Sequence, residues 1–405
     1  MFGLNAWARF WRIEAPFGTP SLIWNMMMSM SGGWFFVTLS EAISVGKTTI
    51  ALPGIGSYIA VAIAQKNLMA IVYAILAMLV VILIYDQLLF RPLVAWADRF
   101  RVDNEQSEET PQSWALTMYR RSRLLDLLTT PFDQMMHWSY QWHPPHFGVR
   151  AAFRDTDSRK ADYVWYAILG LLGCYAAFRV WDFAHANLTW GDLAQAVGLG
   201  FITMTRVLVL IALTSLVWTP IGIYVGLRPR LTQIVQPVAQ FLAAFPANIL
   251  FPLAVSLIVL FRLNPDVWLS PLMVLGTQWY ILFNVIAGAS AFPTDLREAA
   301  TLYRLRSIQW WRDVIIPGIF PYYVTGALTA SGGSWNASIV AEVASWGDTK
   351  LKADGLGAYI AQATEAGDNA RVVLGIVVMS VFVVVFNRLV WRPLYRVSER
   401  RFRLN

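Results

Sequence analysis

Long apolar runs separated by short polar segments dominate the chain, and this pattern predicts helices that cross a membrane. A bilayer core takes roughly 20 apolar residues of helix at about 1.5 Å per residue. Eight runs have about this length, at residues 17–40, 68–90, 163–183, 197–225, 234–261, 267–291, 315–341 and 372–391. The pattern therefore predicts an all-α polytopic membrane protein with about eight transmembrane helices.

Composition and charge placement agree with this interpretation. The chain is 57% hydrophobic and only 14% charged, which is outside the range of ordinary soluble domains. Its formal net charge of +7 does not indicate nucleic-acid binding, because Lys and Arg gather in loops between apolar runs, where they favour the cytoplasmic side. The basic segments 297–312 and 392–403 therefore predict a cytoplasmic C-terminus, and the loop 184–194, without Lys or Arg, predicts an outer position.

A polar segment separates the first two apolar runs from the other six. Residues 102–160 are rich in charged and amide side chains and predict a cytoplasmic linker. Within this linker, residues 111–132 have the composition of an amphipathic helix that lies on the membrane surface. The histidines of the chain show no metal-ligand spacing. They are His137, His143, His146 and His185.

The chain contains an internal repeat with a constant offset of 301 residues, without a gap. The matched pairs are Pro16 and Pro317, Pro20 and Pro321, Gly32 and Gly333, Trp34 and Trp335, Glu41 and Glu342, Gly54 and Gly355, Gly56 and Gly357, Tyr58 and Tyr359, and Arg91 and Arg392. Chance does not keep one offset over so many positions, so the two segments are copies of one unit.

The repeat predicts three regions. Residues 1–101 form the C-terminal part of a first copy with two transmembrane helices, 102–160 the linker, and 161–405 a complete second copy with six. The counterpart of Glu298 would fall just before Met1, because 298 − 301 = −3. We therefore expect a first-half segment with four further spans. A start set too far downstream, a separate partner chain and a real truncation all remain open.

The polar segment 294–317 lies between the fourth and fifth spans of the second copy. Its Glu298-Ala299-Ala300 stretch combines charge with small residues in a short, helix-prone interruption. Small residues permit close approach, and Glu298, Arg304 and Arg306 can pair with polar groups. The stretch therefore predicts a helix that docks against a soluble partner at the membrane surface.

Glu298-Ala299-Ala300, with Pro317 at the later position, resembles the cytoplasmic EAA loop of ABC importer permeases. Residues 332–342, GGSWNASIVAE, are similar to the branch that includes nitrate, taurine, sulfonate and bicarbonate permeases. The resemblance implies a type I ABC importer permease fold in the bacterial cytoplasmic (inner) membrane. The ATPase-coupling residues that it implies are Glu298, Ala299, Ala300, Arg304, Leu305 and Pro317.

The same resemblance implies the partners. Two ABC ATPase subunits would dock on the loop, and an extracytoplasmic solute-binding protein would deliver a small anion of the nitrate, sulfonate or bicarbonate type. The chain would bind no cofactor itself, since ATP and Mg are used by the ATPase. Arg304 departs from the family, which usually has Gly there, and we expect a differently shaped or more continuous coupling helix because Gly would permit a turn.

Polar residues inside spans are costly in lipid and are candidates for the substrate path. Arg206 would either attract an anion or snorkel to the outer interface. Asn248 would either face a cavity at a broken helix or hydrogen-bond a neighbouring helix. The full set of path candidates is Arg206, Asn248, Trp335, Asn336, Glu342 and Trp34. Helix packing across a pseudo-twofold axis is expected at Gly32, Gly33, Gly332 and Gly333.

Other chemistries find little support. Residues 45–48, VGKT, resemble the end of a phosphate-binding loop, but Glu41 stands where that loop needs Gly. Cys174 lies in an apolar run and is expected to be a buried, inert thiol. Two rivals to an ABC permease remain, a secondary transporter and a truncated, non-transporting remnant. Co-purification with an ATPase would discriminate the first rival.

Overall fold

The computed structural model describes residues 6–45, 48–100, 113–121, 130–131, 134–135, 138–139 and 158–401. The chain divides into two compact units. The first comprises Met1–Met27 and Leu83–Asn187, and the second comprises Met28–Ile82 and Leu188–Asn405. Helices α2 (Ala15–Ser40) and α4 (Leu68–Tyr85) contribute to both units. The predicted division into 1–101, 102–160 and 161–405 stays a prediction.

The first unit is helical in its described part. Besides the parts of α2 and α4 that belong to it, it contains α1 (Ala6–Arg9), η1 (Phe10–Glu14), η2 (Asp86–Phe90), α5 (Arg91–Ala97), η3 (Asp98–Phe100), α6 (Trp114–Arg121) and α9 (Ser158–Asn187). Helix α6 falls inside the predicted surface helix, of which residues 122–129 lie outside the described part. The Tyr119 hydroxyl donates to the Leu88 carbonyl at 2.8 Å and holds α6 beside η2.

The second unit holds a helical bundle and two short hairpins. Its first-copy elements, besides α2 and α4, are β1 (Ala42–Val45), β2 (Thr48–Ala51) and α3 (Ile55–Ala64). Its bundle elements are α10 (Trp190–Gly226), α11 (Pro229–Ala244), η4 (Ala247–Leu250), α12 (Phe251–Leu260), α13 (Pro265–Trp268), α14 (Leu272–Leu275) and α15 (Gln278–Ser290). The remaining elements are α16 (Thr294–Leu302), α17 (Ile308–Trp310), η5 (Trp311–Ile315), α18 (Ile316–Ala341), β3 (Val343–Trp346), β4 (Thr349–Lys352), α19 (Leu356–Ala366), α20 (Asn369–Phe386), η6 (Asn387–Trp391) and α21 (Arg392–Arg401).

Several helices have the length and apolar composition to cross a membrane. Four qualify alone, at Leu68–Ala97, Trp190–Gly226, Ile308–Ala341 and Asn369–Arg401, and two bent pairs bring the number to as many as six in the described part. The chain is therefore a multi-pass membrane protein. The other two predicted spans, 17–40 and 163–183, are helical in α2 and α9 but are not among these helices of the described part, so the number eight stays a prediction.

Two of the predicted spans are broken helices. The run 234–261 contains α11 and α12, which are bent by 73° around η4, and the run 267–291 contains α13–α14 and α15, bent by 44°. The first break follows from Pro246 and Pro252, because proline cannot donate the backbone hydrogen bond that a continuous helix needs.

The described chain is mostly helical, in agreement with the predicted all-α class. It also contains two antiparallel hairpins that were not expected, β1–β2 and β3–β4, which pair Ala42 with Ala51 and Val343 with Lys352. Pairing in these hairpins satisfies the hydrogen bonds of backbone N–H and C=O groups in segments whose β-branched residues disfavour a helix. The expected outer loop at 184–194 is also much shorter, since α9 ends at Asn187 and α10 begins at Trp190. A capping box between Thr189 and Asp192 starts α10 early.

The bounds of many elements recur at the offset of the sequence repeat. Adding 301 residues to the bounds of α2, β1, β2, α4 and η2 gives those of α18, β3, β4, α20 and η6. Even the π-helical segments recur, with η1 matching η5. The two copies therefore fold into the same succession of elements. Their arrangement as a pseudo-dimer about a twofold axis stays a prediction.

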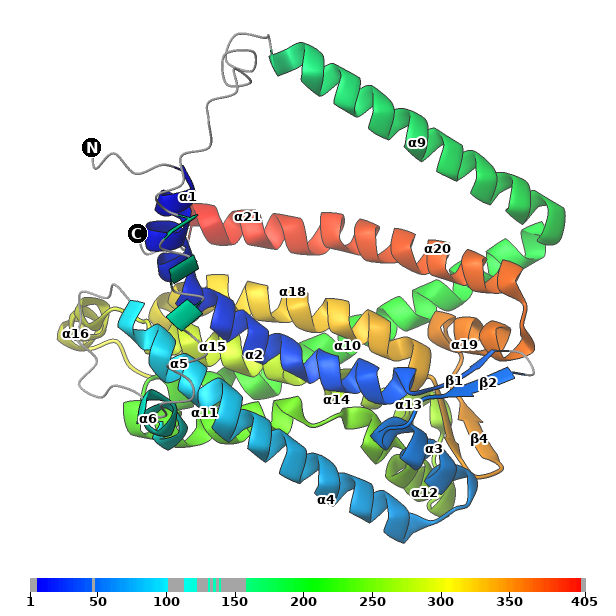
Figure 1. The fold of residues 1–405 in the computed structure, drawn as a ribbon, viewed down its shortest axis with the longest axis horizontal. Coiled ribbons are helices and arrows are strands. Elements are labelled where there is room, and N and C mark those ends of the chain that lie inside the picture. The colour runs from blue at the N-terminus through cyan, green and yellow to red at the C-terminus, as the bar shows by residue number, and fades with distance from the viewer. Residues whose placement is uncertain are drawn as a thin grey trace. The chain divides into compact units, whose positions relative to one another are not determined.

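The main apolar core of the second unit lies among α10, α15 and α18, which pack against one another (Figure 1). Small residues allow this close packing. A Cβ on Gly326 would lie 2.7 Å from the Tyr280 carbonyl oxygen, and one on Gly222 would lie 2.7 Å from Val285. A second apolar cluster joins α3 and α4 of the first copy to Ile249 of the second.

Candidate functional site

The predicted docking segment forms a short helix, α16, which lies at the far end of α18 from the β3–β4 hairpin (Figure 1). Glu298 is exposed on this helix, whereas Ala300 is buried against its own fold. The C-terminal end presents Leu302 and Tyr303, both more than four-fifths exposed. Any contact with a partner would therefore involve Glu298, Leu302 and Tyr303, and Ala300 instead lets α16 lie close to the bundle.

The expectation of a continuous helix through Arg304 is wrong. Helix α16 ends at Leu302, and Arg304 adopts a left-handed backbone with φ of 52°. Leu305 N donates to Ala300 O at 3.0 Å and Arg304 N donates to Thr301 O at 3.0 Å, which is the Schellman arrangement. Arg304 thus makes the turn that Gly would make, at a conformational cost of about 1 kcal/mol.

A second sharp change of direction follows at once. Ser307 also has a positive φ, of 52°, immediately before α17. Helix α17 then continues through the π-helical segment η5 into α18, with Pro317 in its first turn. The wider π-turn brings Ile316 N to Trp311 O just before the proline, which has no N–H to donate. Leu305 and Pro317 are half-buried and fix the way the segment re-enters the bundle.

At the other end of α18, Glu342 is the centre of a buried polar network. Its carboxylate is 1% exposed. Oε1 accepts hydrogen bonds from Thr203 Oγ1 at 2.8 Å and from Arg206 Nη1 at 3.1 Å, and Oε2 accepts one from the Ala358 backbone at 3.0 Å. Thr203 Oγ1 in turn accepts from Leu356 N at 2.9 Å. The network therefore joins α10, the end of α18 and the start of α19.

The Arg206 guanidinium does not present a free charge to an anion in this structure. It is mostly buried and also contacts Asp266 Oδ1 at 3.1 Å and the Asp354 carbonyl at 2.7 Å. Asp266 Oδ1 accepts from Asp354 N at 2.7 Å as well. Two carboxylates, Glu342 and Asp266, thus compensate the one arginine. The location of Arg206 at the outer interface stays a prediction.

The repeat places a second glutamate in the same local setting. Glu41 Oε2 accepts from the backbone of Gly56 at the start of α3, as Glu342 accepts from the start of α19. Both helices begin at a glycine with no side-chain cap, and a carboxylate at a helix N-terminus is favourable. A Cβ on Gly54 or Gly355 would lie 2.3 Å from the glutamate side chain. Both glycines therefore make room for the carboxylate.

The sequence contains a signal for this capping role, although the role itself was not predicted. Glu41 and Glu342 are a matched pair in the repeat, and so are Gly54 and Gly355. A glutamate and a glycine retained together in both copies indicate a contact between them.

Asn248 takes the second of its two predicted roles. It lies in η4 at the break between α11 and α12, and its Nδ2 donates to Thr38 Oγ1 of α2 at 2.9 Å. The broken helix is therefore present, and the Asn248 side chain connects it to a first-copy helix. Asn284 is bonded within its own helix, because its Nδ2 donates to the Tyr280 carbonyl at 2.8 Å.

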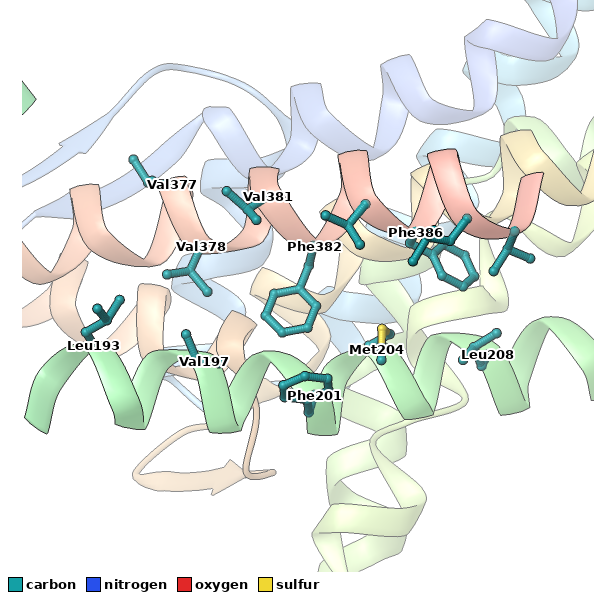
Figure 2. Close-up of a pocket in the computed structure, with 13 residues that line it drawn as sticks. Leu193, Val197, Phe201, Met204, Leu208, Val377, Val378, Val381, Phe382 and Phe386 are labelled. Atoms are coloured by element: carbon teal, nitrogen blue, oxygen red, sulfur yellow. The ribbon is translucent and has the colours of Figure 1, made fainter. Parts of the chain in front are cut away.

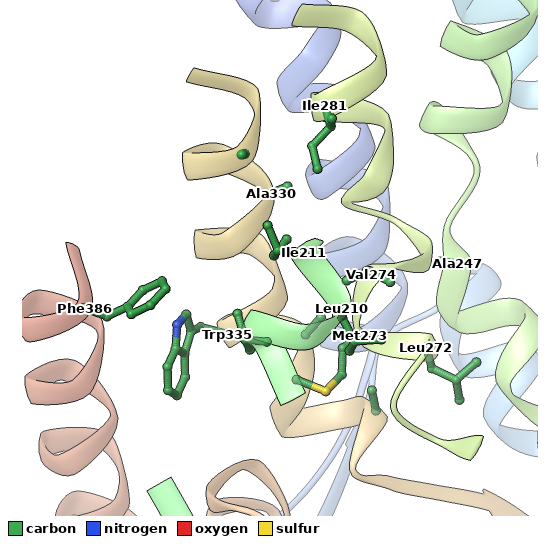
Figure 3. Close-up of a cluster of buried hydrophobic side chains, with 14 of the residues drawn as sticks. Leu210, Ile211, Ala247, Leu272, Met273, Val274, Ile281, Ala330, Trp335 and Phe386 are labelled. Carbon is green, nitrogen blue, oxygen red and sulfur yellow. The ribbon is translucent and has the colours of Figure 1, made fainter. Parts of the chain in front are cut away.

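Trp335 lies in the packed core of the second unit. Its ring is 6.2 Å from that of Phe382, and Phe386 lies nearby (Figure 3). Its indole Nε1 has no hydrogen-bond partner in the described part of the chain. Its counterpart Trp34 is half-buried at the edge of the cluster around α3 and α4. In this structure Trp335 therefore fills the core and does not line an open path.

Helix α18 exposes a stripe of mostly polar residues. Its exposed positions recur at intervals of three and four residues, at Tyr322, Thr325, Thr329, Gly332 and Asn336. This spacing places them on one helix face. A polar face on a membrane helix is costly against lipid, so the stripe suits a water-filled path or a protein partner. Asn336 is the one path candidate whose side chain is exposed.

The glycine pairs do not share one role. Gly333 packs inside the second copy, where an added Cβ would lie 2.6 Å from Thr277 Cγ2, and Gly32 lies near Tyr280. A Cβ on Gly33 or Gly332 would meet no atom within 4 Å. Close packing of the two fifth spans through these four residues is therefore not present in this structure.

An apolar groove of about 640 Å³ runs between α10 and α20 (Figure 2). Phe201 and Phe382 face each other across it, edge to face, at 5.0 Å. Its lining holds no polar side chain, so it does not suit an anion. Cys174, on α9, is exposed, which corrects the expectation of a buried thiol.

The remaining candidate chemistries are not assembled by the fold. No cluster of His, Cys, Asp and Glu that could hold a metal is found among the described residues. His137, His143 and His146 lie outside them. In the VGKT stretch, Val45 ends β1 and Thr48 begins β2, and Gly46 and Lys47 lie outside the described residues. Val45 and Thr48 therefore belong to a hairpin, whereas a phosphate-binding loop joins a strand to a helix.

Broken spans, an exposed polar stripe and a loop helix between two spans are features of a multi-pass membrane protein. Residues 219–403 match the family described as the binding-protein-dependent transport system inner membrane component. This match and the relatives below support the resemblance to ABC importer permeases. Members of this family are transport components and not enzymes.

Individual relatives support the same branch. The chain is 26% identical over 188 residues to the nitrate import permease protein NrtB of Leptolyngbya laminosa, and equally to the bicarbonate transport system permease protein CmpB of Synechococcus elongatus. Each match covers 46% of this chain and 64% of the relative. NrtB of Synechocystis is 24% identical over 196 residues, 48% of this chain and 68% of the relative. The chain thus spans less than two thirds of the first two relatives.

Proposed function

We propose that this chain is the membrane permease component of an ATP-driven importer and forms part of its substrate path. The importer would use two separate ATPase subunits with ATP and Mg²⁺, one of which would dock on α16, and an extracytoplasmic solute-binding protein would deliver the substrate. The family match and the nitrate and bicarbonate permeases among the relatives support this assignment. The chain would lie in the bacterial cytoplasmic membrane with its C-terminus and α16 in the cytoplasm.

The observation that carries the proposal is the shape of the segment from Thr294 to Ser307. A short exposed helix is followed by two left-handed residues, Arg304 and Ser307, and this double turn returns the chain into α18. Leu302 and Tyr303, exposed at the tip, suit insertion into a groove of a partner. Because α18 continues rigidly from this point, a push on α16 would move the helix that carries the polar stripe.

The substrate would be a small anion, as the relatives' names suggest. In this structure Arg206 is not free to hold such an anion, because it is paired with two carboxylates. On the exposed face of α18 the Asn336 amide offers a neutral donor instead, whereas the Thr325 and Thr329 hydroxyls donate to backbone carbonyls of their own helix. Weak neutral donors suit passage, since a tight charged site would slow release.

The test is Glu298→Arg on the exposed face of α16. The variant should insert normally but lose transport and substrate-stimulated ATPase activity, because like charge would repel the partner's pairing group. Glu365→Arg is the matched control, since Glu365 is also exposed but lies in α19, the helix that follows the β3–β4 hairpin. Unchanged transport and stimulated ATPase activity in Glu298→Arg would exclude α16 as the docking element. An active protein without any co-purifying ATPase would favour a secondary transporter.

A further inference from the structure

The second unit contains the same structural element twice, each time closed by a glutamate. In the first copy, α2 is followed by the β1–β2 hairpin and α3, and the Glu41 carboxylate accepts a hydrogen bond from the start of α3. In the second copy, α18 is followed by the β3–β4 hairpin and α19, and the Glu342 carboxylate accepts one from the start of α19. The second residue of each of these helices is a glycine, Gly56 in α3 and Gly357 in α19. A Cβ on Gly56 would lie 1.9 Å from the Thr38 carbonyl oxygen, and one on Gly357 would lie 2.4 Å from that of Ser338.

In the second copy this element is completed by α10. Thr203 and Arg206, three residues apart on α10, both donate to Glu342 Oε1, and Thr203 also accepts from the first residue of α19. Helix α10 packs along α19. Helix α20 packs against α19 as well, and in this setting Ala353 is 1% exposed and Tyr359 is 8% exposed.

In the first copy the corresponding place is open. No cation among the described residues pairs with Glu41, and its carboxylate is only half-buried. Leu52, the counterpart of Ala353, is 56% exposed, and Tyr58, the counterpart of Tyr359, is 45% exposed. The two matched tyrosines thus differ in exposure, because α10 and α20 both pack against α19, whereas α3 has, in the described part of the chain, no helix in the place of α10 and contacts α4 far less.

We propose that Glu41, Leu52 and Tyr58 form a docking site for one membrane helix of a further permease segment. That helix would carry a hydroxyl residue and, three positions later, an arginine, as α10 does. The hydroxyl would bridge the carboxylate and the start of α3, and the arginine would compensate the charge of Glu41. The proposal rests on the comparison of the two copies and depends neither on the substrate nor on docking of an ATPase.

Charge complementarity selects this occupant. An acyl chain would cover Leu52 and Tyr58 but would leave the Glu41 carboxylate with its hydrogen bond from Gly56 and no compensating cation, which is unfavourable in an apolar setting. A soluble basic peptide would satisfy Glu41 but would not cover the apolar side chains. A membrane helix with an arginine at the matching depth does both, and the Glu342 network shows that the fold accepts it.

The test uses the chain's own α10 as the probe. A tagged fragment of residues 188–228 would be co-expressed in membranes with the full chain, and the captured fragment quantified after mild solubilisation. Glu41→Gln should lower capture about tenfold or more, as loss of one partner of a buried charge pair does. Leu52→Asp, at an exposed position that should not disturb folding, should lower it as well. Glu365→Gln, in the equivalent hairpin-to-helix element of the second copy, should not.

A charge swap separates docking from loss of fold. Glu41→Arg in the chain should abolish capture of the wild-type fragment and restore capture of a fragment that carries Arg206→Glu. The proposal would be overturned if the wild-type chain and Glu41→Gln captured equal amounts of the fragment, or if the charge swap did not restore capture. Lipid would then be the expected neighbour of this surface. Self-association of the full chain through this surface without the fragment would also overturn it, because the occupant would then be a second copy.

Discussion

Removal of Arg206 provides the most quantitative test of the polar network at the end of α18. In Arg206→Met the Glu342 carboxylate, 1% exposed, would keep its bonds from Thr203 and the Ala358 backbone but lose its cation. Breaking a buried ion pair by removal of one partner costs about 3–5 kcal/mol. We expect a destabilisation in that range, because the Arg206 side chain is only 12% exposed and solvent screens it little.

A double-mutant cycle isolates the pair. Glu342→Gln alone removes the charge but keeps an acceptor oxygen, and the double variant Arg206→Met/Glu342→Gln leaves no buried charge from this pair. The two effects should therefore be less than additive, with a coupling of about 1–3 kcal/mol. Asp266→Asn is the control. Its side chain is 48% exposed, so its loss of charge should cost less than about 1 kcal/mol.

The assay is unfolding of the purified protein in mixed micelles, followed by tryptophan fluorescence and near-ultraviolet circular dichroism. Additive effects of Arg206→Met and Glu342→Gln, within about 0.5 kcal/mol, would show that the two side chains do not stabilise each other. An Asp266→Asn variant as unstable as Arg206→Met would move the centre of the network to the more exposed carboxylate. Either result would refute the assignment of the Arg206–Glu342 pair as the stabilising centre of the network.

Two further predictions concern backbone geometry. Arg304→Gly should stabilise the fold by about 0.5–1 kcal/mol, because Gly adopts the left-handed backbone without strain. Thermal unfolding would measure this change. A fall in stability would indicate that the contacts of the Arg304 side chain outweigh the strain of its backbone. Gly357→Ala should destabilise by about 1–3 kcal/mol, because the added Cβ would lie 2.4 Å from the Ser338 carbonyl oxygen. Gly332→Ala, with no atom within 4 Å, is its control and should not destabilise the helix.

The sequence was sufficient for the helical nature of the chain, because apolar runs of bilayer length leave few alternatives. It also placed the break at Asn248, since paired prolines interrupt a helix whatever its surroundings. The hairpins escaped prediction because each strand has only four residues, too few for a period-two pattern to stand out. The early start of α10 escaped because Thr189 and Asp192 precede the apolar run that defines the span.

Side-chain partners were harder to predict than elements. The ion-pair partners of Arg206 were not predicted, because nothing in its local sequence reveals two carboxylates, 60 and 136 residues away along the chain. The turn at Arg304 was misjudged for another reason: the absence of glycine was taken to exclude a left-handed residue. The Schellman hydrogen bonds of Arg304 and Leu305 show that a whole set of contacts can impose this conformation on a non-glycine residue.

Position 66 of the first copy corresponds to position 367 of the second, and both residues have a positive φ after a helix. Lys66 has φ of 53° and Gly367 has φ of 72°. The Lys66 Nζ donates to Asp348 Oδ2 at 2.8 Å, and the Lys66 methylene groups lie beside Gly347. The Gly347 N–H donates to the Ile63 carbonyl. The hydrogen bond from Lys66 also lowers the pKa of Asp348 below its ordinary value.

Each duplicate has therefore diverged into a specialised half of a matched set. The unfavourable backbone conformation of Lys66 in the first copy is offset by contacts of its side chain with Gly347 and Asp348, at the tip of the second copy's hairpin. This contact therefore joins unlike groups of the two copies, a lysine from one and an aspartate from the other, although the matched segments share the same succession of elements.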